Sequence, residues 1–210
     1  MLRIIIRLSD LVKELEKYVI EKILDKVVLD CDNDCMKIIK DKKIFYIEDR
    51  KMFKLPSIDI PSLFGLKTQG ITLDQIFYLA GMDLYVKDYQ YPDLRTLSKP
   101  ICIIDSGIYD KHDVFRDSRV EITKDSVIGG DGSDDIGHGT SVSSIIAYLL
   151  PYSKIVSIKI FGETHKEASA SDLLKALSKC KDYNCAVVNL SLGGALTEEE
   201  EKMIDETLRD

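Results

Sequence analysis

The sequence predicts an α/β protein in which a doubly wound parallel sheet follows a small α+β unit. Strand-like and helix-like segments alternate from Pro100 onwards, and Ile101–Ile104 form a continuous apolar run. Such alternation indicates parallel strands joined by helices, and an uninterrupted apolar run is typical of a strand buried on both faces. The order of strand, helix and further strands within residues 2–48 predicts the smaller unit.

The N-terminal unit is expected to contain one helix among several strands. Residues 10–24 predict the helix, because their apolar side chains recur at the spacing of one helix face, and Ser9 or Asp10 is its expected N-cap. The pattern does not decide the type of the short apolar segment at residues 35–39. Runs rich in β-branched and aromatic residues predict strands at residues 2–8, 26–30 and 43–48.

Prolines and glycines interrupt residues 55–99, which are expected to be a linker and the entry to a second domain, with a helix at residues 71–80. We therefore predict an α+β domain at residues 1–54 and part of an α/β domain at residues 100–210. In this second domain the pattern predicts strands at residues 101–104, 154–161 and 185–192, and helices at residues 141–150, 168–179 and 197–208.

Side chains that cap helices mark the starts of the last two predicted helices. Ser169 or Ser171 is expected to cap the helix at residues 168–179. Thr197 and Glu200 have the spacing of a capping box, in which each side chain accepts a hydrogen bond from the other residue's backbone amide.

The composition is that of an ordinary globular protein. Hydrophobic residues make up 45% and charged residues 31% of the 210 residues, and the net charge is −7. A negative balance without a basic block argues against a nucleic-acid-binding surface. No apolar stretch is long enough to span a bilayer, and the N-terminal MLRIIIRLSD lacks the longer apolar run of a signal peptide. We expect a cytoplasmic protein that binds neither nucleic acid nor a membrane.

The five cysteines do not predict a metal site. Cys31 lies close to Cys35, and Cys180 lies close to Cys185, but neither spacing matches a common zinc pattern. Free or locally paired thiols are therefore expected, and no residue is assigned to a metal.

Asp105 and His138 are the candidate catalytic residues. Asp105 follows the strand at residues 101–104, where a carboxylate can accept a hydrogen bond from an imidazole and fix its tautomer. His138 lies between Gly137 and Gly139 at a predicted helix start, so its ring is expected to be accessible. Taken singly, each has an ordinary alternative. Asp105 is then the cap of a turn or helix, and His138 is a surface or core histidine.

Four segments resemble, in order, motifs of the subtilisin-like serine proteases (peptidase S8): ICIIDSGI at 101–108, DDIGHGTSVSSIIA at 134–147, SIKIFG at 157–162 and VVNLSLGG at 187–194. The resemblance implies a subtilisin-like fold and hydrolysis of peptide bonds, with Asp105 orienting His138 and His138 acting as the general base. It also implies a cleft for a peptide or protein substrate, in which an added substrate strand pairs with Ser191, Leu192 and Gly193, and in which Phe161 lines a nearby subsite.

The chain departs from the family pattern at two points. It has Ser141 where the family has a second histidine, and we reject Ser141 as a nucleophile because it lies on the same short helix as His138. The family's nucleophilic serine follows its histidine by roughly 160 positions. That position, like the oxyanion-hole asparagine, is expected beyond Asp210. The resemblance thus implies a partial sheet with an exposed edge, and a chain that is inactive alone.

Residues 1–54 resemble the propeptides of this family, which are small α+β domains that chaperone folding and inhibit the cleft. Residues 40–55 resemble their final strand, so that Glu48 and Asp49 would lie where such propeptides cap helices of the protease. A generic α+β module is the alternative.

Several interpretations of function remain open. They are an incomplete protease, one chain of a split protease whose second chain carries the serine, and a non-catalytic pseudoprotease or inhibitor-like binding protein. No cofactor is assigned. Calcium binding or selection of basic substrates by Asp131, Asp134 and Asp135 is an alternative to a solvated acidic loop. A nucleotide-binding loop at residues 129–139 is disfavoured, because the segment lacks the lysine of a P-loop.

Overall fold

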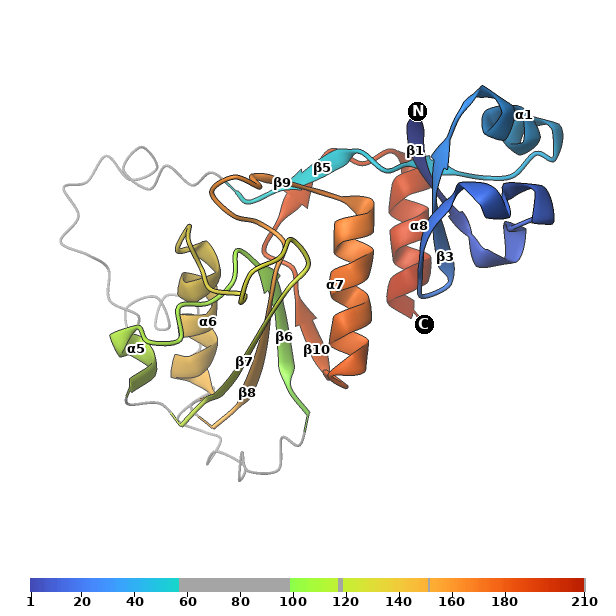
Figure 1. The fold of residues 1–210 in the computed structure, drawn as a ribbon. Helices are drawn as coiled ribbons and strands as arrows, with labels where there is room; N and C mark the ends of the chain where they lie inside the picture. The colour runs from blue at the N-terminus through green and yellow to red at the C-terminus, as the bar shows by residue number, and fades with distance from the viewer. Residues whose placement is uncertain (57–98, 117–118, 151, 210) are drawn as a thin grey trace.

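The computed structural model describes residues 1–56, 99–116, 119–150 and 152–209. The predicted helix at residues 71–80 lies outside the described residues. In the described part, two units stand side by side, each with its own β-sheet (Figure 1). Helices α7 (Ala170–Asp182) and α8 (Glu198–Arg209) lie between the two sheets.

The N-terminal unit is an antiparallel sheet of order β2-β3-β1-β4. Ile4 of β1 lies opposite Leu29 of β3, and the next residue, Ile5, lies opposite Val28. Because successive side chains of a strand point to opposite faces, Ile4 packs in the cluster that contains α1, whereas Ile5 packs with residues of α7 and α8. The elements are β1 (Leu2–Arg7), two 3₁₀ helices (Leu8–Asp10 and Lys13–Tyr18), β2 (Val19–Ile23), β3 (Lys26–Cys31), α1 (Asn33–Asp41) and β4 (Ile47–Glu48).

The prediction of a helix at residues 10–24 is wrong. The chain forms the two 3₁₀ helices there and then enters β2, which pairs with β3. β2 contains the β-branched residues Val19, Ile20 and Ile23, which suit a pleated strand, so cross-strand pairing outweighs the local helical spacing. The undecided segment at residues 35–39 lies within α1.

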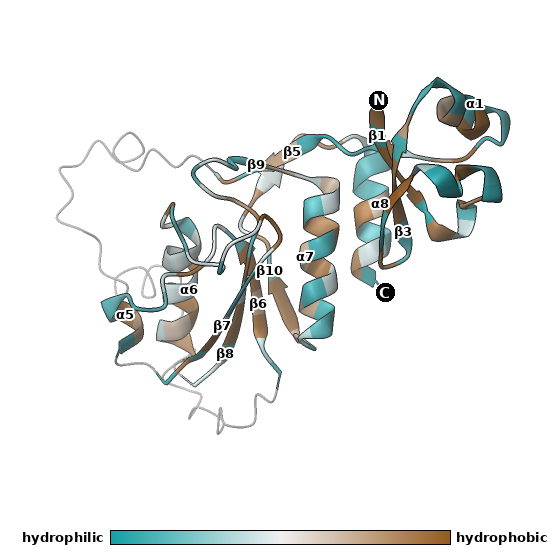
Figure 2. Cartoon of the chain, in the orientation of Figure 1, coloured by the Kyte–Doolittle hydropathy of each residue, from teal (hydrophilic) through white to brown (hydrophobic). Residues whose placement is uncertain are grey.

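The second unit is a parallel sheet of order β10-β6-β8-β7, which confirms the predicted α/β class. Helices α6 and α7 lie on opposite sides of the sheet (Figure 1), and apolar residues are frequent in its strands β6, β8 and β10 (Figure 2). Strand β6 pairs with β10 and with β8, and helices cover both faces of the sheet at this central strand (Figure 1), which explains its continuous apolar run. The elements are β6 (Ile101–Asp105), α5 (Asp113–Arg116), β7 (Glu121–Ser126), α6 (His138–Leu149), β8 (Lys154–Lys159), β9 (Glu167–Ser169), α7, β10 (Val187–Asn189), β11 (Gly193–Gly194) and α8.

Helices α7 and α8 both begin at predicted caps. Ser169 is the N-cap of α7 and forms a capping box with Asp172. At the start of α8, the Thr197 hydroxyl accepts from the Glu200 amide at 3.2 Å, and the Glu200 carboxylate accepts from the Thr197 amide at 2.8 Å. The capping box predicted at residues 197–200 is therefore confirmed.

Strand β5 (Lys51–Lys54) leaves the N-terminal unit and joins the second one. It pairs antiparallel with β11 on one side and with β9 on the other, at the edge of the second unit (Figure 1). Met52 and Phe53 are buried in a cluster that contains residues of both units. The domain boundaries expected at 1–54, 55–99 and 100–210 stay a prediction.

Four of the five cysteines are paired in the structure. Cys31 and Cys35 form the kind of local pair that the sequence predicts. Cys180 pairs with Cys102, 78 positions away, rather than with nearby Cys185, so this disulfide links β6 to α7. Cys185 keeps a free thiol.

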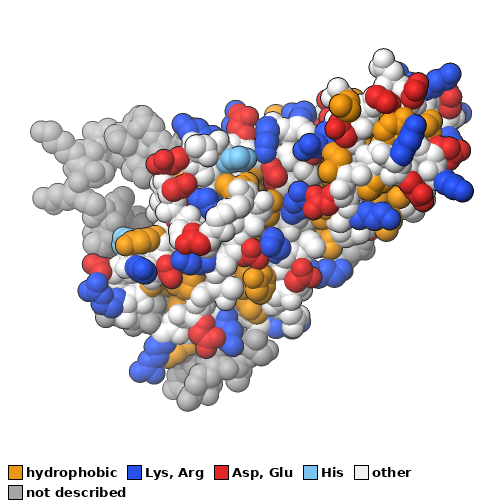
Figure 3. Space-filling model, viewed as in Figure 1, with side chains coloured by type: hydrophobic (Ala, Val, Ile, Leu, Met, Phe, Trp, Pro, Cys, Tyr) orange, Lys and Arg blue, Asp and Glu red, His pale blue; other side chains and the backbone are white. Residues whose placement is uncertain are grey.

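The surface of the described part is mixed in charge. On the face that Figure 3 shows, Lys and Arg side chains are interspersed with Asp and Glu side chains. None of the helices in the described ranges is both long and apolar enough to cross a membrane.

Candidate active site

Asp105 lies at the carboxyl end of the central strand β6, where sites form in open parallel sheets. Its side chain is fully buried. Its backbone carbonyl accepts hydrogen bonds from the Ile160 and Phe161 amides at 2.8 and 3.3 Å, so the chain that follows β8 fixes this strand end. Its carboxylate accepts from the Ser106 amide at 2.6 Å.

His138 is the first residue of α6, and its ring faces Asp105. Its Nδ1 lies 2.8 Å from Oδ1 and 2.9 Å from Oδ2 of Asp105. Because an ionised carboxylate only accepts hydrogen bonds, Nδ1 carries the proton, and the Nε2 of the neutral ring is then a proton acceptor. The structure thus brings together the two predicted catalytic residues in the geometry that a general-base histidine needs.

Burial raises the pKa of the Asp105 carboxyl, whereas hydrogen bonds from His138 and from the Ser106 amide oppose that rise. The ionised form of a buried carboxylate is stabilised by a hydrogen-bond donor that can itself become positively charged. The same contact stabilises the imidazolium that forms when His138 takes up a proton.

Two glycines allow helix α6 to approach strand β6 this closely. A Cβ at position 139 would lie 2.2 Å from the Gly107 carbonyl oxygen and 3.2 Å from Asp105 Oδ1. Gly137 has a φ of 95°, in the left-handed region that favours glycine, and it is the N-cap of the helix. The glycines on either side of His138 therefore have separate roles, one in close packing and one in the turn.

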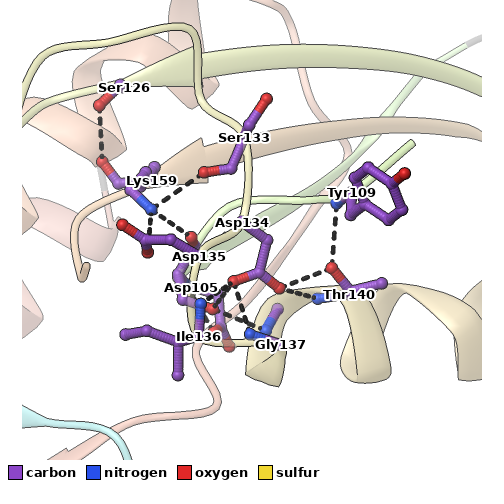
Figure 4. A network of polar contacts seen from close by, with 12 residues as sticks. Asp105, Tyr109, Ser126, Ser133, Asp134, Asp135, Ile136, Gly137, Thr140 and Lys159 are labelled. Atoms are coloured by element: carbon purple, nitrogen blue, oxygen red, sulfur yellow. Dashed lines mark hydrogen bonds and ion pairs between the residues drawn. The ribbon is translucent and has the colours of Figure 1, made fainter. Parts of the chain in front are cut away.

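A network of polar contacts supports the loop before His138 (Figure 4). The ammonium of Lys159 donates to the carbonyls of Ser106 and Ser133, both at 3.0 Å, and to Asp135 at 2.6 Å. Asp134 accepts from several donors around the start of α6. Sequence reasoning gave Asp134 no role in this support, although its place four residues before His138 was the available signal.

The three aspartates of the acidic loop accept hydrogen bonds from the protein itself. Asp131 accepts from Ser133, Asp134 from donors near α6, and Asp135 from Lys159, so the three carboxylates serve separate protein donors. Within the described ranges, no group of three or more His, Cys, Asp or Glu side chains is placed to hold a metal ion.

Of the residues predicted to bind substrate, Phe161 follows strand β8 and the other three follow strand β10. Gly193 pairs with Lys54 of β5, so this edge is occupied by a strand of the same chain. Ser191 Oγ accepts from Asn189 at 2.9 Å, and Leu192 packs at the margin of the core. Phe161 has no exposed surface, because it packs in the same cluster as Met52 and Phe53. The substrate-binding roles of Ser191, Leu192, Gly193 and Phe161 stay predictions.

The sequence also predicts an ordinary helical setting for Ser141 and a capping role for Asp49. Ser141 Oγ donates to the Gly137 carbonyl at 2.8 Å within its own helix, as expected of an ordinary helical serine. Asp49 caps α7, as predicted, by accepting hydrogen bonds from the amide and the hydroxyl of Ser171.

Comparison with known proteins agrees with this geometry. The chain is 26% identical over 137 residues to Subtilisin-like protease 3 of Pseudogymnoascus destructans, covering 60% of this chain and 33% of that protein. It is 26% identical over 170 residues to Alkaline protease 1 of Aspergillus flavus, covering 75% and 39%. The chain thus spans between a third and two fifths of the length of these relatives. The sequence profile of the subtilase family, Peptidase S8, matches residues 99–209. The chain therefore belongs to the subtilase family of peptidases.

Proposed function

We propose that this protein serves serine-type peptide-bond hydrolysis, with His138 as the general base and then the general acid. His138 Nε2 removes the proton of a serine hydroxyl as the oxygen attacks the peptide carbonyl, and the ring then returns that proton to the leaving amine. Asp105 holds the ring and stabilises its charged form. The observation that carries the proposal is the double contact between His138 Nδ1 and the buried Asp105 carboxylate.

The nucleophile is proposed to come from outside residues 1–210. Among the described serines near the pair, Ser106 is engaged with Asp134, and Ser141 is engaged with its own helix. We propose that a serine on a further segment of the same polypeptide, or on a second chain, completes the site together with an oxyanion-hole asparagine. The 210-residue polypeptide alone is then inactive.

Residues 1–54 are proposed to act as an inhibitory propeptide of the same active site. β5 occupies the edge of β11, where a substrate strand would pair with Gly193, and Phe53 packs in the cluster that buries Phe161. A peptide substrate cannot occupy that edge while β5 does. Removal of the N-terminal unit is therefore a step towards activity in this proposal.

The first test is the intact mass of the protein from its native source, followed by reaction with a fluorophosphonate probe for activated serines. A mass near 23.8 kDa without labelling supports inactivity of the chain alone. A larger, labelled protein supports a serine on the same polypeptide, and co-purification of a second, labelled chain supports a split protease.

In the labelled form, His138→Ala abolishes labelling and peptide hydrolysis. His112→Ala, which changes an exposed histidine whose ring accepts from the nearby Val114 amide, preserves both. Hydrolysis that survives His138→Ala refutes the proposal.

A non-catalytic, inhibitor-like binding protein is the second candidate, and the docking of β5 between β9 and β11 favours it. The 210-residue chain would then inhibit a complete subtilisin-like protease added in trans. Absence of inhibition at micromolar concentration counts against this second function.

A further inference from the structure

Asp134 accepts five hydrogen bonds within the loop and helix that carry His138. Its Oδ1 accepts from the Ser106 hydroxyl at 2.8 Å and from the Ile136 and Gly137 amides at 3.0 and 2.8 Å. Its Oδ2 accepts from the amide and the hydroxyl of Thr140 at 2.9 and 2.5 Å. Figure 4 shows Asp134 between the turn at Ile136 and Gly137 and the first turn of α6 at Thr140.

These donors belong to the residue after Asp105 and to residues before and after His138 in the chain. Ser106 follows Asp105 directly, and its hydroxyl also accepts from the amide of Gly139, the residue after His138, at 2.9 Å. Asp134 therefore connects the strand end that carries Asp105 to the backbone on both sides of His138. The backbone around the imidazole is fixed by donors that converge on one side chain.

We propose that Asp134 is a positioning residue, whose carboxylate holds the helix start at the distance from strand β6 that keeps His138 hydrogen-bonded to Asp105. The inference rests on the proposed function, because it assigns Asp134 to the same site. Asp134 does not touch the reacting atoms in this role and acts through Ser106, Gly137 and Thr140.

Only a carboxylate satisfies this set of donors. Each oxygen of Asp134 faces at least one backbone N–H, Oδ1 those of Ile136 and Gly137 and Oδ2 that of Thr140. A hydroxyl can rotate and accept instead of donate, but a backbone N–H cannot. Asparagine would place its own NH₂ against one of these N–H groups in either orientation, and a donor would be left without an acceptor.

The charge state of Asp134 agrees with this role. Its partial burial raises the cost of ionisation, but hydrogen bonds from the Thr140 hydroxyl and from the Gly137, Thr140 and Ile136 amides outweigh that cost and lower its pKa. The ionised form that the five donors require is therefore the form present at neutral pH.

Lys159 belongs to the same network of polar contacts (Figure 4). Its ammonium ties the Ser106 carbonyl to the Ser133 carbonyl and to the Asp135 carboxylate. Ser106 is thus joined to the loop before His138 through its hydroxyl, by way of Asp134, and through its carbonyl, by way of Lys159. Asp134 joins this network to α6 at Thr140, and Ser106 joins it to α6 at Gly139.

The test follows the His138 ring proton by NMR in the isotope-labelled 210-residue chain. This Nδ1 proton exchanges with water only when the bond to Asp105 opens, so its exchange rate measures how well the pair is held. We compare the wild type with Asp134→Asn. Asp131→Asn is the matched control, because it makes the same charge change in the same loop at an exposed residue that accepts hydrogen bonds from its near neighbour in sequence, Ser133.

The expected result is that Asp134→Asn accelerates exchange of the His138 proton by about tenfold or more, whereas amide exchange in β1 and the Asp131→Asn control stay unchanged. If Asp134→Asn does not fold, Thr140→Val supplies the comparison. It removes one donor without changing charge, and Thr140→Ser, which restores the hydroxyl, returns exchange to the wild-type rate.

Three outcomes overturn the inference, and they differ in what they say of the proposed function. A wild type that shows the protected His138 proton, with Asp134→Asn or Thr140→Val leaving its exchange unchanged, refutes the positioning role alone. A wild type without any protected ring proton refutes the Asp105–His138 pair, and with it both proposals. Acceleration that is equal throughout β1 also refutes positioning, because it shows general loss of stability.

Discussion

Asp49 and Ser171, 122 positions apart in sequence, share two hydrogen bonds that join the N-terminal unit to the start of helix α7. Oδ1 of Asp49 accepts from the Ser171 amide at 2.9 Å, and Oδ2 accepts from the Ser171 hydroxyl at 2.7 Å. The first four amides of a helix have no partner within the helix, so this contact satisfies one of them from outside. It also places negative charge at the positive end of the helix.

Replacing Asp49 by alanine is expected to destabilise the chain by about 1–2 kcal/mol, as loss of a helix cap does. Asp49→Asn is the matched control. Its amide oxygen can accept from the Ser171 amide while its NH₂ donates to the Ser171 hydroxyl, so both contacts survive. Urea unfolding measures both variants. Equal losses for alanine and asparagine would show that the charge, and not the hydrogen-bond pair, carries the effect.

The two glycines of β11 are expected to differ in their tolerance of a methyl group. A Cβ at Gly194 would lie 2.4 Å from the Met52 carbonyl oxygen and 3.3 Å from the Phe53 ring, whereas a Cβ at Gly193 meets nothing within 4 Å. Gly194→Ala should therefore push β5 away, at a cost of about 1–3 kcal/mol. Gly193→Ala should stay within about 0.5 kcal/mol of the wild type.

Cleavage by trypsin after Lys51 and Lys54 measures the release of β5 in these variants. Gly194→Ala is expected to be cut there faster than the wild type, and Gly193→Ala at the wild-type rate. Identical cleavage of the two variants would mean that β11 does not hold β5 in solution.

Of the ion pairs between the two units, that of Arg50 with Glu200 is expected to contribute most. The Arg50 guanidinium donates to both oxygens of Glu200, at 3.0 and 2.8 Å, and to the Ala195 carbonyl, and Glu200 is buried. Arg50→Ala leaves a buried carboxylate without its cation and should cost about 1.5–3 kcal/mol. Arg50→Lys should recover little, because lysine cannot form the paired contact.

Lys54→Ala is the control for Arg50, since it removes an ion pair with Glu167 in which both side chains are largely exposed. Exposed pairs contribute less than about 1 kcal/mol. The two variants are compared by urea unfolding at low and high salt. A larger loss from Lys54→Ala than from Arg50→Ala would contradict the assignment of the stronger contact to Arg50.

The parts of the fold that were predicted correctly are those in which local pattern and tertiary burial agree. The apolar run of β6 follows from burial of both strand faces between helices α6 and α7 (Figure 1), and the caps of α7 and α8 are short-range features. β7 was not predicted, because it lies at the sheet edge and its sequence, EITKDS, carries a single large apolar side chain, Ile122. The helix predicted at residues 10–24 failed because pairing with β3, a long-range contact, decides the structure of that segment.

In the candidate site, too, the sequence predicts the residues that belong to motifs and not the contacts that depend on the fold. Motifs single out Asp105 and His138, and the structure brings their side chains together. The five bonds of Asp134 run mostly to backbone amides, whose directions depend on loop geometry and not on residue type. The pair of Cys102 with Cys180 joins distant segments, and the residue pattern did not predict it. The resemblance to propeptides implied that Asp49 caps a helix, but it did not identify Ser171 as the partner.

Acid is expected to loosen the contact between β5 and α7 through Asp172. Its carboxylate accepts from Lys51 of β5 at 2.6 Å and from the Ser169 amide at 2.9 Å. Burial opposes its ionisation, but these bonds outweigh burial and lower its pKa below the ordinary 3.8. A carboxyl with a lowered folded-state pKa contributes stability above its unfolded value, and this is lost as pH falls through the folded value.

The measurement is the free energy of unfolding of the wild type and of Asp172→Asn as a function of pH. Their difference should be constant above about pH 5 and shrink below pH 3.8. A difference that does not change between pH 3 and pH 7 would show that the Asp172 charge makes no net contribution to stability.

The pairing of the cysteines predicts that one thiol of the five is available for alkylation. The chain, unfolded in denaturant without reductant, should add a single iodoacetamide group, at Cys185, and five groups after reduction. In the folded chain Cys185 should react slowly, because burial raises the pKa of its thiol and the thiolate is the reactive form.

Disulfides persist mainly in oxidising compartments, so trapping thiols in the source cells also tests the expected location. One reactive thiol there would contradict a cytoplasmic protein, and five would contradict both disulfides.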